Sequence, residues 1–152
     1  MGMMIGLMLH VLAAVIWVGG MFFAYMVLRP SLSSVEPSVR LPVWQGVFAR
    51  FFLWVWLSIV VLAASGYTMI SQEFGGFSTV SPYVRVMMTT GVVMILIYLG
   101  LYFIPWRRFR AAVASADWAA ADAQVKRIRL LVGINLILGL ATLLVAAGGR
   151  FY

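Results

Sequence analysis

The sequence contains no cysteine, only four acidic residues and a single histidine, His10. Without cysteine the protein has no disulfide, no thiolate metal site and no thiol nucleophile, so cysteine usage gives no information on its redox compartment. The sequence also shows no acidic pair, no serine accompanied by a histidine and an acid, and no phosphate-binding loop. Hydrolysis and phosphoryl transfer therefore have no recognisable residues, and we assign no catalytic residue.

Charge of either sign is scarce, and apolar residues take its place. Hydrophobic residues make up 64% of the 152 residues, and charged residues make up 10%. A soluble domain of this size cannot bury so much apolar surface, so the composition predicts an integral membrane protein. Four segments are long enough to cross the hydrocarbon layer as helices, at about 2–28, 43–70, 82–104 and 128–147. We expect one all-α domain over residues 1–152, a transmembrane four-helix bundle.

The connections between these spans carry the helix-breaking residues. Arg29-Pro30 is expected to stop the first helix, and Ser31–Pro42 is expected to be a polar loop. Pro105 is expected to kink or end the third span. The alanine-rich segment Trp106–Arg129 then predicts a helical hairpin that extends the third and fourth helices beyond the bilayer. Its turn is expected near Ser115-Ala116, with Ser115 as a helix cap.

The basic residues indicate the orientation in the membrane. Eight of the eleven lie in the segments 29–42 and 106–129, which share one side of a four-span protein. The positive-inside rule places this side in the cytoplasm, so both termini are expected outside, in a bacterial inner membrane. The net charge of +7 is therefore interpreted as a topology signal and a contact for lipid headgroups, not for nucleic acid.

His10 lies within the first apolar run, 1–28, which contains no charged side chain. We expect this run to be a retained helix and not a signal peptide. A titratable residue in a membrane helix normally faces the bundle interior or a cavity, so His10 is a candidate functional residue. Its neighbours three and four positions away, Gly6, Leu7, Ala13 and Ala14, cannot bind a metal. A second ligand must therefore come from another helix.

Depth in the bilayer suggests which residues could share a site with His10. Met88 and Met94 of the third span bracket the level of His10, and thioether with imidazole suits Cu(I) or haem iron. Trp17 lies on the same helical face as His10, and Arg85 could meet a haem propionate. The predicted metal ligands are therefore His10, Met88 and Met94, and the predicted cofactor contacts are His10, Trp17 and Arg85. Methionine also fills gaps between helices, and for any single one of them packing is the better explanation.

The run His10-x6-Trp17-x-Gly19-Gly20, with the basic-proline stop at Arg29-Pro30, resembles the first helix of the copper resistance protein D (CopD) domain family. Three later segments fit the same pattern: Phe48-Ala49-Arg50-Phe51, Ser65-Gly66-Tyr67 and Tyr83-Val84-Arg85. The resemblance covers most of the chain. It implies four or more transmembrane helices and a part in copper uptake or homeostasis.

The chain is also distantly similar to the HemJ-type protoporphyrinogen oxidase family, in which a first-helix histidine is thought to bind haem b. That family's pattern includes a lysine in the third helix. The segment Val86–Ile104 contains none, so the sequence departs from the oxidase pattern.

Three functions stay open at the level of sequence. The first is a CopD-like protein of copper handling, with copper or haem b at His10. The second is a b-type haem redox protein, whose other axial ligand is a methionine or His10 of a second subunit; an enzyme of this kind would be a haem-dependent oxidoreductase. The third is a cofactor-free structural or assembly subunit, in which His10 only hydrogen-bonds to a hydroxyl such as that of Ser65.

Expected partners are membrane lipid, a second copy of the chain or another subunit of a membrane complex. Asn135 is expected to form a hydrogen bond between helices.

Overall fold

The computed structural model describes residues 2–73, 75 and 80–149, and within these residues every regular element is a helix. In chain order the elements are α1 (Gly2–Phe22), η1 (Phe23–Leu28), α2 (Arg29–Ser31), α3 (Pro37–Glu73), α4 (Pro82–Leu101), η2 (Tyr102–Trp106), α5 (Arg107–Ala114) and α6 (Trp118–Gly148). They form four rods, 2–31, 37–72, 82–114 and 118–148, each long and apolar enough to cross a membrane. The predicted all-α transmembrane four-helix bundle is confirmed.

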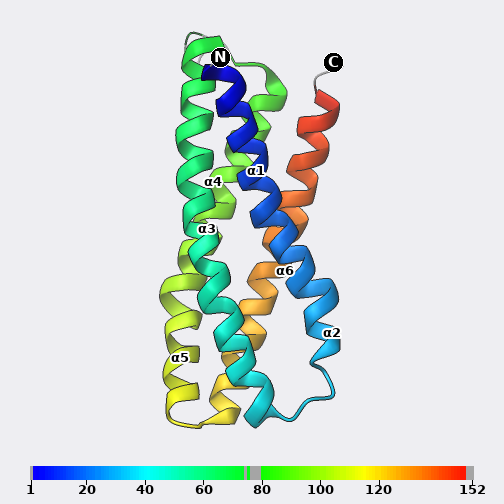
Figure 1. The fold of residues 1–152 in the computed structure, drawn as a ribbon, viewed down its shortest axis with the longest axis vertical. Coiled ribbons are helices and arrows are strands. Elements are labelled where there is room, and N and C mark those ends of the chain that lie inside the picture. The colour runs from blue at the N-terminus through cyan, green and yellow to red at the C-terminus, as the bar shows by residue number, and fades with distance from the viewer. Residues whose placement is uncertain (1, 74, 76–79, 150–152) are drawn as a thin grey trace.

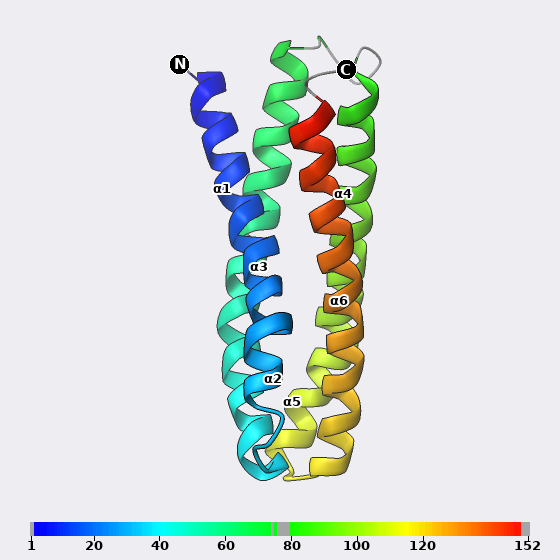
Figure 2. The same ribbon diagram turned by 90° about the vertical axis from the view of Figure 1, so that its right-hand side faces the viewer.

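The four rods run up and down in turn, so the start of α1 and the end of α6 lie at the same end of the bundle (Figure 1). The first rod packs mainly against α3, and α4 packs mainly against α6. The first half of α1 leans away from α6, whereas the later part of the same rod comes close to it (Figure 2). We call the end of the bundle that holds Arg29, Arg40 and the turn between α5 and α6 the basic end. The first rod therefore lies closest to α6 toward the basic end and stands apart from it where the chain starts.

The second rod begins earlier than the sequence suggested. The structure starts α3 at Pro37 and continues it to Glu73, so the predicted loop Ser31–Pro42 is too long. Proline suits the first helical position because its missing N–H would have no partner there. Pro42 lies inside α3, but so close to its start that it disturbs only the first turns.

Two further prolines do not end their rods, and both are accompanied by π-helical turns. The stretch η1 leads directly into Arg29-Pro30, and η2 contains Pro105. In a regular α-helix a proline ring clashes with the carbonyl four residues earlier, and the wider π turn moves that carbonyl away. The expected stop at Arg29-Pro30 is therefore wrong, since the rod continues to Ser31. The third rod likewise passes Pro105 and runs to Ala114.

The hairpin between α5 and α6 forms where the sequence predicted it, with a turn at Ser115-Ala116. The predicted cap is wrong. The carboxylate of Asp117 accepts a hydrogen bond from the backbone N–H of Ala120 at 3.0 Å and so caps α6. The Ser115 hydroxyl instead donates back to the carbonyl of Ala111 at 3.2 Å, at the end of α5.

Polar groups inside the bundle join neighbouring rods. The side-chain amide of Asn135 donates to the Met94 carbonyl at 3.1 Å, which confirms the predicted hydrogen bond between helices.

One turn further along α6, Gly139 allows close approach to α1. A Cβ atom at this position would lie 2.8 Å from Cγ2 of Val18. A larger residue would therefore force these helices apart.

Candidate functional site

The single histidine is bound to the neighbouring helix. Nδ1 of His10, on α1, lies 2.8 Å from the hydroxyl oxygen of Ser65, on α3. Ser65 is buried and His10 is half-buried. The next residue, Gly66, also faces the ring, since a Cβ atom there would lie 3.5 Å from Cε1 of His10, an ordinary van der Waals contact. The predicted interhelical bond between His10 and Ser65 is confirmed.

The partners of Ser65 determine which ring nitrogen of His10 carries the proton. The Ser65 hydroxyl donates its only proton to the carbonyl of Val61, one turn earlier on α3. It must therefore accept a hydrogen bond from His10, so Nδ1 is the protonated nitrogen. In this neutral tautomer Nε2 keeps its lone pair, and this is the nitrogen that can bind a metal.

The methionines predicted to share the site lie on the third rod. Met94 is buried, and its methyl group packs 3.2 Å from the Cβ position of Gly139, between α4 and α6. Because α1 packs mainly against α3, the helix pairing gives no support for a site that combines His10 with Met88 or Met94. Both assignments stay predictions.

The two other predicted contacts have different surroundings. Trp17 is buried, and its ring meets that of Tyr98 edge-on, with centroids 6.3 Å apart. Trp17 is therefore part of the core. Arg85 lies in the first turn of α4, where its backbone N–H donates to the carbonyl of Ser81. Their roles as cofactor contacts stay predictions.

The observed pairing of α1 with α3 draws attention to Met69, a methionine of the second span that is not among the predicted ligands. Met69 follows Ser65 by four residues and so lies on the same side of α3. Side chains of a helix tilt toward its start, and these two rods run in opposite directions. The side chains of His10 and Met69 therefore tilt toward each other. Gly6, one turn before His10, also faces α3, since a Cβ atom there would lie 4.0 Å from the hydroxyl oxygen of Thr68.

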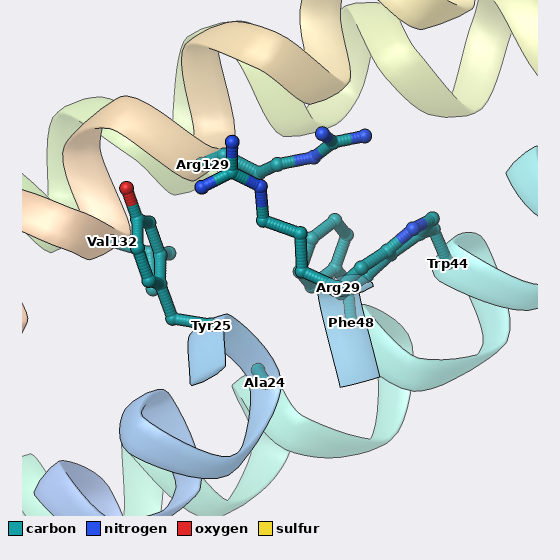
Figure 3. A pocket seen from close by; sticks show the side chains of 7 residues that line it. All are labelled: Ala24, Tyr25, Arg29, Trp44, Phe48, Arg129 and Val132. Carbon is teal, nitrogen blue, oxygen red and sulfur yellow. The ribbon is translucent and has the colours of Figure 1, made fainter. Parts of the chain in front are cut away.

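No group of three His, Cys, Asp or Glu side chains that could hold a metal is found among residues 2–73, 75 and 80–149. A metal at His10 would therefore need thioether ligands from this chain or ligands from a second molecule. Two pockets lie at the opposite end of the bundle. One is a small cavity of about 10 Å³ lined by Ala24, Tyr25, Arg29, Trp44, Phe48, Arg129 and Val132 (Figure 3). The other is an open groove lined by Gln45, Arg107, Arg110, Ala111 and Ala114.

Comparisons with known proteins agree with this architecture. A family model described as copper resistance protein D matches residues 45–148. A curated protein of Aquifex aeolicus (strain VF5), named only as an uncharacterized protein, is 32% identical over 147 residues. That match covers 95% of this chain and 91% of the relative. No solved structure matches the chain.

Proposed function

The chain belongs to the copper resistance protein D family, and from this we propose that it is a membrane protein of copper handling that holds Cu(I) as a cargo through His10. The observation that carries the proposal is the hydrogen bond between His10 Nδ1 and Ser65, because it leaves Nε2 able to bind a metal. Thioether and imidazole are ligands that suit Cu(I). Met69 is the thioether that we assign to the same site.

The surroundings of His10 suit a small ion better than a haem. A haem held by His10 would need a broad, flat space next to α1, whereas the ring lies against Ser65 and Gly66 of α3. A single ion needs only Nε2 and one or two further donor atoms. We therefore propose copper in place of the haem b alternative.

Replacing Ser65 by alanine is expected to weaken Cu(I) binding about 10- to 100-fold, as is typical when a metal-ligating histidine loses the group that orients it. Without the hydroxyl, Nδ1–H has no partner, and the ring is free to rotate and to change tautomer. The measurement is a titration of the detergent-purified full chain with Cu(I) against a competing chelator.

Thr68→Val is the matched control for this titration. It removes a hydroxyl from the next turn of α3, where the side chain donates to the Ser65 carbonyl at 2.9 Å. Its Cu(I) affinity should equal that of the unchanged chain. Equal affinities for Ser65→Ala and Thr68→Val would contradict the assigned role of the His10–Ser65 bond, and a wild-type chain that binds no Cu(I) would refute the proposed function.

The same hydrogen bond also favours one alternative, in which His10 only joins α1 to α3 in a cofactor-free structural subunit. An interhelical bond of this kind in a membrane contributes about 0.6–1.7 kcal/mol. The alternative predicts that Ser65→Ala lowers stability by such an amount and leaves copper content unchanged. The titration and a thermal unfolding curve of the same sample therefore distinguish the two functions.

A further inference from the structure

Basic residues from the first, second and fourth rods meet at the basic end of the bundle, and they outnumber the carboxylates there. Arg40 at the start of α3 and Lys126 on α6 both bind Asp122, at 3.2 Å and 2.9 Å. Asp122 and Lys126 lie in the polar part of α6, before the predicted apolar span 128–147. The hydrogen bond from Lys126 lowers the pKa of the Asp122 carboxyl, so it is ionised at neutral pH. Each of its oxygens already has a cationic partner.

Arg29 and Arg129 complete the cluster without an ion pair of their own. Within the described ranges 2–73, 75 and 80–149, neither forms an ion pair. Arg29, Asp122 and Arg40 all lie close enough to Arg129 to act on it electrostatically, and the Asp122 carboxylate is already shared with Arg40 and Lys126. In addition, Nε of Arg129 is buried and has no hydrogen-bond partner in this part of the chain. An unpaired buried donor beside other cations is costly, so this arrangement favours an added anion.

The two arginines line one small cavity (Figure 3). The Arg29 guanidinium lies 4.9 Å from the ring centre of Tyr25, and that of Arg129 lies 5.8 Å from the ring centre of Trp44. These aromatic contacts hold both cationic groups beside the cavity. Its floor is apolar and includes Ala24, and its volume of about 10 Å³ holds no more than one water. An anion must therefore bind at the mouth, between the guanidinium groups, where the Arg29 side chain is exposed.

We infer that Arg29 and Arg129 form a binding site for a phosphate group, at the junction of the first rod, α3 and α6. A planar guanidinium fork matches the oxygens of a phosphate, and two such forks can hold one phosphate from two sides. The phosphate can come from an anionic lipid headgroup or from free phosphate. This site does not depend on the proposed role of His10, which lies at the other end of the bundle.

The test compares single arginine variants of the full chain. Native mass spectrometry measures retention of phosphatidylglycerol against phosphatidylcholine, and calorimetric titration in a neutral detergent measures binding of inorganic phosphate. Arg29→Gln and Arg129→Gln are each expected to lower binding about fivefold, the effect of one cation at an anionic surface. Arg108→Gln is the matched control, because it removes an exposed arginine from α5 at the same end of the bundle.

Each outcome decides the inference. Retention of phosphatidylglycerol that depends on Arg29 and Arg129 supports the site with a lipid as the source, and phosphate binding with the same dependence supports it with free phosphate as the source. If Arg29→Gln behaves like Arg108→Gln, or if neither probe binds the unchanged chain, the inference is overturned. Arg129→Lys keeps the charge of Arg129 but removes its planar guanidinium group. If Arg129→Gln fails to fold, Arg129→Lys and Arg29→Gln together decide the test.

Discussion

Replacing His10 by alanine is expected to abolish Cu(I) binding at the proposed site, a larger effect than the loss of its orienting serine. The imidazole supplies the only nitrogen ligand that we assign, and the thioether of Met69 alone cannot hold the ion. The same change removes the hydrogen bond to Ser65 and is expected to lower the free energy of unfolding by about 0.6–1.7 kcal/mol. Metal analysis after equilibration with buffered Cu(I), together with thermal unfolding, measures both effects.

His10→Gln separates the two roles of the histidine. A glutamine amide can donate to the Ser65 hydroxyl, but it offers Cu(I) only a hard oxygen or a non-basic nitrogen. The glutamine variant should therefore recover much of the lost stability and none of the copper binding. Full copper binding in either variant would show that His10 is not a ligand.

Replacing Phe109 by alanine is expected to lower the free energy of unfolding by about 3–5 kcal/mol, the usual cost of deleting a buried phenylalanine. Phe109 lies on α5 and is 0% exposed. Its ring centre lies 6.2 Å from that of Phe48 and 5.9 Å from that of Trp106, so it joins the second rod to the third. Its removal would leave a cavity in the core at the basic end of the bundle. Chemical unfolding of the detergent-solubilised chain, followed by tryptophan fluorescence, measures the loss.

Phe103→Ala is the control for this change, because it deletes the same side chain from η2 where it is 53% exposed. It should alter the free energy of unfolding by less than about 1 kcal/mol. Equal losses for the two variants would mean that the basic end of the bundle is not a packed core. Cu(I) affinity at the distant His10 should stay unchanged in both.

The fold was predictable from the sequence because apolar length alone determines how many helices can cross a membrane. The helix ends were less predictable, since proline is a stop signal only in a regular α-helix. At Pro30 and Pro105 the chain forms π turns that accommodate the ring, and no composition rule signals them. The cap of α6 was missed for a different reason: Ser115 and Asp117 are both good caps, and only the turn geometry selects Asp117.

The candidate site was predictable in part. A lone histidine in a charge-free helix identified His10, and a hydroxyl at the same depth identified Ser65 as one of several partners. The choice of neighbouring helix was the step that the sequence could not supply. Depth matching is equally good for α3 and α4, and only the packing of α1 against α3 favours Met69 over Met88 and Met94.

Copper K-edge X-ray absorption of the full chain loaded with one equivalent of Cu(I) tests the central claim most directly, because it detects the atoms bound to the metal. We expect imidazole scattering together with a sulfur neighbour. The imidazole signal should disappear in His10→Ala, and the sulfur signal should disappear in Met69→Leu but not in Met94→Leu. A spectrum without imidazole scattering, or one that His10→Ala leaves unchanged, would contradict the assignment of His10 as a copper ligand.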